Sequence, residues 1–195
     1  MQQIALPFDE LHPGRADDCL IVTVSNAAAF TALGNRSNWP NHCAILFGPP
    51  RSGKSLMARY FEGLGGKAID DADRLAEELL FHQWNAAKEA GSLLLLVSAH
   101  GPADWNISLP DLRSRLGAAQ LLEIGELDDE LAEQLLLKYL RDRGTSIGPE
   151  ALAFALRRIE RSHKAVEAFA RQANAMALAE AAPITLPLVK RLIER

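Results

Sequence analysis

The sequence feature that most restricts the fold is the octapeptide GPPRSGKS at residues 48–55, which directly follows the apolar run CAILF at residues 43–47. It fits the motif G-x-x-x-x-G-K-[S/T], in which glycines let successive backbone N–H groups turn inward around a phosphate. Residues 56–64 then have the spacing of a short helix, whose N-terminal dipole favours a negative charge. A buried strand, this loop and a helix in that order predict a phosphate-binding loop. A structural Gly-Pro turn is the alternative.

Two side chains of the loop have a direct chemical task. Lys54 is expected to neutralise the outer phosphates of a nucleotide, and the Ser55 hydroxyl is expected to ligate Mg²⁺. The rest of the expected cofactor-binding loop consists of Gly48, Pro49, Pro50, Arg51, Ser52 and Gly53. We therefore expect a nucleotide with its phosphates over residues 53–55.

The order of apolar runs and helical patterns predicts the fold class. Strand-sized apolar runs lie near residues 44–48, 67–70, 93–98 and 120–124, and helical patterns lie between them at residues 56–64 and 72–90. Strands that alternate with helices predict an α/β fold in three layers around a parallel sheet. From residue 127 onward all the patterns are helical.

Three segments follow from these patterns. Residues 1–16 contain Pro7, Pro13 and Gly14, which break any regular period, so this segment is expected to be an irregular, flexible arm. Residues 17–125 are expected to form the nucleotide-binding domain, and residues 126–195 a helical lid subdomain.

Composition excludes several classes of protein. With 48% hydrophobic residues, 24% charged residues and a formal net charge of −4, the chain has no field suited to holding a phosphate backbone, so direct DNA binding is not expected. Cys19 and Cys43 have no metal-ligand spacing, and the first residues carry no secretion signal. The longest apolar run, residues 93–97, is too short to cross a bilayer, so we expect a cytoplasmic protein.

Polar side chains are expected at the ends of the strands after the loop. Asp70 and Asp71 follow one strand and supply adjacent carboxylates, Asp70 to hold Mg²⁺ and Asp71 to polarise the attacking water. A solvated turn or a helix cap is the alternative for this pair. Ser98 ends the next strand, where a hydroxyl can touch a γ-phosphate or its water, unless it caps its own turn.

Two arginines and one lysine are further candidates. Arg113 and Arg115 lie two residues apart in the segment LPDLRSRL at residues 109–116, just before the last strand. On a helix they point in different directions, so one can pair internally while the other reaches a neighbouring subunit. Lys164 lies near a helix start, where a cation can lean over the nucleotide. Solvent-exposed surface cations are the alternative for all three.

At these residues the sequence resembles the DnaA family of replication initiators, and within it the short regulatory members of the Hda type. Residues 20–30, LIVTVSNAAAF, resemble the family's stretch beside the adenine, and residues 48–55 its Walker A motif. Asp70-Asp71 resembles its Walker B motif and Ser98 its sensor strand. Residues 109–116 resemble its box VII, with Arg115 at the arginine-finger position. The resemblance covers essentially all 195 residues.

The N-terminal hexapeptide QIALPF at residues 3–8 resembles the regulator's peptide for docking onto the DNA polymerase sliding clamp. The residues that the resemblance assigns to this contact are Gln3, Ile4, Leu6 and Phe8. A glutamine followed by spaced apolar residues suits an extended peptide that enters an apolar pocket. The alternative is an apolar N-terminus that packs on its own domain.

The resemblance implies an AAA+ P-loop fold and a regulatory function. A clamp-bound, nucleotide-loaded regulator meets a DnaA-type initiator that carries ATP, Arg115 acts on that ATP in trans, and hydrolysis prevents reinitiation. The implied ligands are ADP or ATP with Mg²⁺, with the base near Leu20, Val22 and Val24 and with Lys164 closing from the lid. A homo-oligomer is compatible with this interpretation, and hydrolysis by the chain itself is left open.

Two departures from the family affect these expectations. Only residues 56–69 separate Ser55 from Asp70, too few for the helix, strand and helix that normally intervene. A nine-residue helix spans roughly 13 Å at about 1.5 Å per residue, enough only to return along the sheet. We therefore expect four strands in the order 5-1-4-3, without the edge strand of the family's 5-1-4-3-2 order. Lys164 also replaces the usual sensor 2 arginine and lacks its bidentate fork.

Two other functions compete with the regulatory one. An autonomous ATPase or loader of the DnaA family would hydrolyse ATP without a partner, and the intact Lys54 and Asp71 are compatible with it. A small-molecule kinase is the weaker alternative, because the sequence has no evident arginine-rich acceptor lid.

Overall fold

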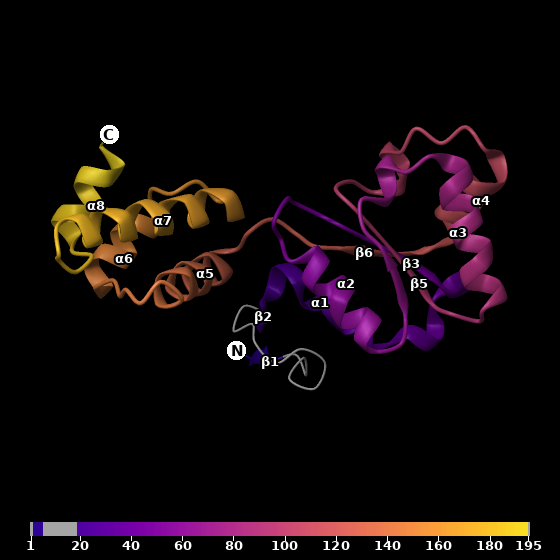
Figure 1. Cartoon of the computed structure of the whole chain (residues 1–195), viewed down its shortest axis with the longest axis horizontal. Helices are drawn as coiled ribbons and strands as arrows, with labels where there is room; N and C mark the ends of the chain where they lie inside the picture. The colour runs from indigo at the N-terminus through magenta and orange to yellow at the C-terminus, as the bar shows by residue number, and fades with distance from the viewer. Residues whose placement is uncertain (1, 6–18, 195) are drawn as a thin grey trace. The chain divides into compact units, whose positions relative to one another are not determined.

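The computed structural model describes residues 2–5 and 19–194. The chain divides into two compact units, Met1–Gly125 and Glu126–Arg195. The division falls where the sequence changes from alternating strands and helices to helices alone (Figure 1). In the described residues, no helix combines the length and the apolar composition needed to cross a membrane.

The first unit is built on a parallel sheet whose strand order confirms the sequence prediction. Its strands are β3 (Cys43–Phe47), β4 (Lys67–Ile69), β5 (Leu94–Ser98) and β6 (Gln120–Glu123), in the order β4-β5-β3-β6. Read from β6, this is the expected order 5-1-4-3. Within the described residues no further strand lies between β3 and β4, because α2 (Lys54–Gly63) returns the chain directly to β4.

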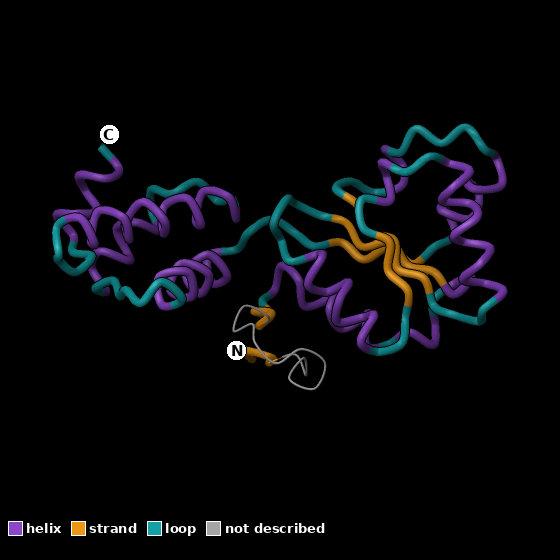
Figure 2. The backbone as a smooth tube through the Cα atoms, in the orientation of Figure 1, coloured by secondary structure: helices purple, strands orange, loops and turns teal. Residues whose placement is uncertain are grey.

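Helices cover both faces of the sheet (Figure 2). On one face α1 (Val24–Gly34) and α2 pack on the alternate strand residues Ala44 and Leu46. On the other face α3 (Glu77–Glu89) and α4 (Pro110–Ala118) pack on Cys43 and Ile45. Consecutive residues of β3 thus face opposite layers, as a strand buried on both sides requires. Burial also raises the pKa of the Cys43 thiol far above its usual range, which keeps it an unreactive core group.

The second unit is helical in the part that the structure describes, as the sequence predicts. Its helices are α5 (Asp129–Arg141), α6 (Pro149–Leu156), α7 (His163–Ala179) and α8 (Leu186–Ile193). Asp128 caps α5 by accepting a hydrogen bond from the Leu131 N–H at 2.7 Å, and Ser162 caps α7 by accepting one from the Ala165 N–H at 3.2 Å. These side chains satisfy N–H groups that a helix start leaves without partners.

The structure differs from the sequence prediction in two places. The single helix expected over residues 72–90 is wrong: a turn of 3₁₀ helix, η3 (Ala72–Arg74), is followed by extended backbone at Leu75 before α3 begins. This interruption lets Ala72 join the core beneath β5. The expectation of irregular backbone throughout residues 1–16 is also wrong, because β1 (Gln2–Ala5) pairs antiparallel with β2 (Cys19–Val22). Further 3₁₀ turns are η1 (Arg36–Asn38), η2 (Pro40–His42) and η4 (Pro102–Asp104).

Two glycines make the packing of this unit testable. A Cβ on Gly66 would overlap the ring of Phe61, which is fully buried and stacks on Trp39 with 5.2 Å between ring centroids. We expect Gly66→Ala to lower the free energy of unfolding by about 1–3 kcal/mol, the usual result of overpacking a core.

Gly117 is the matched control, because a Cβ there meets no atom within 4 Å and the residue lies inside α4. Gly117→Ala should raise the free energy of unfolding by roughly 0.5–1 kcal/mol through the better helix propensity of alanine. Urea unfolding of both variants checks the pair, and equal stability of the two proteins would contradict it.

Candidate functional site

The loop after β3 is held by backbone conformations that favour glycine at both ends. Gly48 has a φ of 151°, and a Cβ there would lie 2.5 Å from the carbonyl oxygen of Ile124. Gly53 has a φ of 92° and forms the N-cap of α2. Both values lie where side chains are disfavoured. The two motif glycines thus let the chain turn tightly from the end of β3 into α2.

Lys54, the first residue of α2, folds back over this loop. Its Nζ donates hydrogen bonds to the carbonyl oxygens of Gly48 and Pro49, both at 2.7 Å. Burial lowers the pKa of the Lys54 ammonium, while the Asp70, Asp71 and Asp73 carboxylates act in the opposite direction. The lysine therefore places a half-buried cation in the turn, close to a helix N-terminus.

The structure brings Ser55 and Asp70 together, although 15 residues separate them in the chain. The Ser55 hydroxyl donates a hydrogen bond of 2.6 Å to Oδ2 of Asp70. The other carboxylate oxygen of Asp70 accepts the N–H of Asp71 at 3.0 Å. A hydroxyl and a carboxylate are hard oxygen donors of the kind that Mg²⁺ prefers. These side chains therefore fit the metal site that the sequence predicts, and Asp71 is exposed beside them.

Ser52 adds a buried polar group to this loop. The residue is 4% exposed, and among the residues that the structure describes its hydroxyl has no hydrogen-bond partner. A buried polar group without a partner costs about 1–3 kcal/mol. A phosphate on the loop would bring acceptor oxygens to this part of the turn. Pro50 and Arg51 form its exposed outer side, and Pro49 is half-buried.

Ser98 makes its side-chain hydrogen bond within its own turn. It ends β5 opposite Phe47 in the register of the sheet and is 2% exposed. Its hydroxyl donates a 2.7 Å hydrogen bond to the carbonyl of His100 and so caps its own turn.

The three residues expected near the base have different surroundings. Leu20 is 4% exposed and approaches Gly53, whose added Cβ would lie 3.4 Å from the Leu20 Cδ1. Val22 is half-buried against the same core, whereas Val24 is 88% exposed at the start of α1. Leu20 thus supports the loop from inside the unit, and Val24 offers an open apolar surface.

Asn26 is a site-supporting residue that sequence reasoning missed. It is 2% exposed; its Oδ1 accepts the N–H of Thr23 at 2.9 Å, and its Nδ2 donates to the carbonyl of Ile21 at 2.9 Å. This capping box fixes the turn that carries Val24. The signal was present in the spacing of Thr23 and Asn26.

Both arginines of α4 make contacts within the chain. Arg115 donates to Oδ1 of Asn85 at 2.7 Å and to Oδ2 of Asp111 at 2.8 Å, and its guanidinium lies 4.7 Å from the centroid of the Phe81 ring. Arg113 donates from Nε to the carbonyl of Ile107 at 3.1 Å, and from Nη2 to the same oxygen. Arg115 therefore joins α4 to α3, and Arg113 holds the loop before α4.

Glu77 anchors the same loop and was also missed from the sequence. Its two carboxylate oxygens accept the N–H groups of Ser108 and Leu109, both at 2.8 Å. These backbone hydrogen bonds lower the pKa of the Glu77 carboxyl. No local motif marks this role, because 31 residues separate Glu77 from Ser108.

The remaining predicted residues lie apart from the loop or outside the description. Lys164 is exposed in the first turn of α7, in the second unit. Gln3 and Ile4 lie in β1, opposite Ile21 and Leu20. Leu6 and Phe8 lie outside the described residues.

Comparison with known proteins places the fold. No protein-family model matches this sequence. Domain III of the replication initiation protein DnaA from Thermotoga maritima matches with a TM-score of 0.76 and 14% identity, over 94% of this chain and 98% of that chain. AMPPCP-bound DnaA from Aquifex aeolicus matches with a TM-score of 0.61 and 15% identity, over 78% of this chain and 62% of the longer DnaA chain.

A Thermotoga maritima RuvB, the Holliday junction branch migration motor, matches with a TM-score of 0.62 and 17% identity, over 87% of this chain and 66% of that one. At sequence identities of 14% to 17%, the similarity shows a shared fold. The order of the four parallel strands, the helical layers and these matches agree: the chain has the AAA+ P-loop fold that its sequence predicts.

Proposed function

We propose that this chain is a regulator of replication initiation that binds adenine nucleotide, docks on the sliding clamp and promotes hydrolysis of ATP held by a DnaA-type initiator. The observation that carries the proposal is the group formed by Lys54, Ser55 and Asp70 on the loop after β3. It lies in a fold shared with DnaA domain III, and similar DnaA structures hold AMPPCP, an adenine nucleotide analogue.

Each residue of the loop has a defined part in nucleotide binding. Lys54 exchanges its two backbone carbonyl acceptors for phosphate oxygens, and the N–H groups at the start of α2 add the positive end of the helix dipole. Ser55 and Asp70 would hold Mg²⁺, which neutralises phosphate charge when bound. We assign Asp71, which follows Asp70, to orient water, and the exposed Val24 to contact the base.

Replacement of Lys54 tests nucleotide binding. A nucleotide that binds only the native protein raises its free energy of unfolding by about 2.7 kcal/mol at a hundredfold excess over Kd. We expect ADP with Mg²⁺ to raise the melting temperature of the parent protein, and Lys54→Ala to remove most of that rise. Lys88→Ala, an exposed lysine of α3, is the control and should keep it. An equal rise in both variants would place the nucleotide elsewhere.

The regulatory step is assigned to Arg115. Phosphoryl transfer spreads negative charge over the γ-phosphate oxygens, and an arginine inserted from a neighbour is worth about 10³ to 10⁵ in rate. In the isolated chain the Arg115 guanidinium donates to the side-chain amide oxygen of Asn85 and to the carboxylate of Asp111. Insertion into the active site of a partner would exchange these two acceptors for phosphate oxygens. The Arg115 side chain is 25% exposed, and Asp111 is 65% exposed, so the pair borders solvent.

We expect Arg115→Ala to keep the nucleotide-induced rise in melting temperature but to lose stimulation of the initiator's ATP hydrolysis. Arg113→Ala should reduce stimulation less, because Arg113 holds a loop of its own chain. Arg115→Lys keeps the positive charge but loses the bidentate fork. This variant therefore separates the effect of charge on stimulation from the effect of bidentate hydrogen bonding. Phosphate release by the initiator with each variant is the measurement. Stimulation by Arg115→Ala at the parent level would disprove the mechanism.

The clamp contact is assigned to Gln3, Ile4, Leu6 and Phe8. The backbone of Gln2–Ala5 is extended, which is the form of a peptide that enters a groove. Its ladder with β2 joins only four residue pairs, and a two-stranded ladder of this size is marginal in water, so its release requires little free energy.

Alanine at Gln3, Leu6 and Phe8 together should abolish binding to the sliding clamp in a co-purification assay, because the anchoring side chains are lost. The melting temperature and its response to ADP should stay at the parent values. Clamp binding that survives the triple replacement would remove this peptide from the proposal.

One specific observation favours an autonomous ATPase as the second candidate. Asp71 lies beside Asp70 as a hydrolytic site requires, and RuvB, a branch migration motor, shares the fold. The purified chain alone distinguishes the two: a motor hydrolyses ATP without the initiator, whereas the regulator requires it.

A further inference from the structure

The strand β6 forms one edge of the parallel sheet, and half of its backbone groups point away from the sheet. At its end the Ile124 N–H donates to the carbonyl of Phe47 at 2.8 Å, so Ile124 and Leu122 turn their backbone groups toward β3. In a parallel ladder the alternate residues, Leu121 and Glu123, turn theirs outward. The side-chain Nε2 of Gln120 donates to the Leu121 carbonyl at 3.2 Å. This carbonyl therefore accepts a hydrogen bond from a side chain, as expected of a carbonyl that points away from β3.

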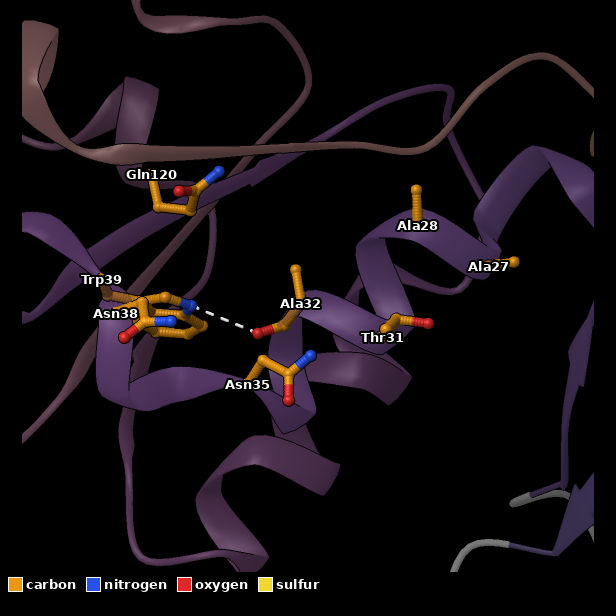
Figure 3. A pocket seen from close by; sticks show the side chains of 8 residues that line it. All are labelled: Ala27, Ala28, Thr31, Ala32, Asn35, Asn38, Trp39 and Gln120. Carbon is orange, nitrogen blue, oxygen red and sulfur yellow. Dashed lines mark hydrogen bonds between the residues drawn. The ribbon is translucent and has the colours of Figure 1, made fainter.

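A pocket of about 460 Å³ lies beside β6 on the face that α1 covers. Its polar side chains are Thr31, Asn35, Asn38 and Gln120, and alanines of α1 supply much of the rest (Figure 3). None of the described residues that line it is charged. The pocket therefore suits a small or neutral polar side chain that exchanges hydrogen bonds with carboxamides.

A second pocket, of about 480 Å³, lies beside β6 on the opposite face. Its apolar lining includes Trp105, Ile107, Leu116 and Leu121, and Leu121 is 49% exposed. Among the described residues that line it, Arg113 alone is charged, and that guanidinium already donates to the carbonyl of Ile107. This pocket suits an apolar side chain.

The two pockets lie on opposite faces of the sheet, as the side chains of consecutive strand residues do. Gln120 and Leu121 are consecutive, so they point to opposite faces, and each lines one pocket. We propose that the β6 edge binds an extended, uncharged segment of a partner protein as a fifth strand. Its backbone pairs with Leu121 and Glu123, and its alternate side chains enter the apolar pocket and the carboxamide pocket. This mode of recognition takes affinity from the main chain and specificity from alternate pockets.

The other edge of the sheet lacks these features and supplies the control. β4 has three residues, and the Nζ of Lys67 donates to Oε1 of Gln83 at 2.5 Å across its start. Short edges with a lysine resist pairing, whereas an edge that exposes a large apolar residue favours it. The proposal concerns β6 alone and does not depend on nucleotide, clamp or initiator.

The test uses a fluorescent synthetic heptapeptide in which threonine and valine alternate, added to the full chain without nucleotide. We expect binding by fluorescence anisotropy and at least tenfold slower amide hydrogen exchange at Leu121 and Glu123, with no change at Ala68. Leu121→Lys should weaken binding at least tenfold, and Leu79→Lys, at a leucine of α3 that is 46% exposed, should not. Leu121 is exposed, so its replacement leaves the core intact.

Two N-methylated peptides decide whether backbone pairing holds the complex. One peptide is N-methylated at its threonines and the other at its valines. Because only one alternate set of peptide N–H groups faces β6, one of the two peptides should lose binding and the other should keep it. Loss with the valine set indicates an antiparallel strand and loss with the threonine set a parallel one; each supports the proposal. No binding at millimolar peptide, equal binding of both methylated peptides, or full binding by Leu121→Lys would overturn it.

Discussion

The contact between Gly48 and Ile124 is the constraint on which the first unit depends. The two backbones approach so closely that a Cβ on Gly48 would lie 2.5 Å from the Ile124 carbonyl oxygen. Beside it, the Ile124 N–H donates to the carbonyl of Phe47 at 2.8 Å. One pair of segments therefore sets both the turn that begins the phosphate loop and the register of β6. The same register decides which backbone groups of β6 face outward.

The residues on the loop place one cation among several hydrogen-bond acceptors and carboxylates. Burial lowers the pKa of the Lys54 ammonium, and three nearby aspartates act in the opposite direction. Two carbonyl oxygens accept its hydrogen bonds. Carbonyl dipoles are weaker partners for an ammonium than phosphate oxygens are. In the proposed complex a phosphate would replace these weak acceptors by strong ones, and a cation would replace the hydrogen bond between Ser55 and Asp70.

Sequence reasoning succeeded where local signals decide the structure. The apolar runs predicted the four strands, and the short separation of Ser55 from Asp70 indicated that the edge strand of the resembled family's 5-1-4-3-2 order is missing. It failed where distant groups decide. No glycine or proline marks the break at Leu75, and the roles of Glu77 and Asn85 come from partners about 30 residues away. The pockets beside β6 likewise combine segments that only the fold brings together.

The loop at residues 48–55 and the β6 edge lie in the same compact unit, so ligands proposed for the two places act on the stability of one unit. Ile124 joins them, because it follows β6 and lies against Gly48. A ligand that binds only the folded unit raises its free energy of unfolding by RT ln(1 + [L]/Kd). If the strand and the nucleotide bind independently, these two contributions add. A sum that departs from additivity measures a coupling free energy between the two places.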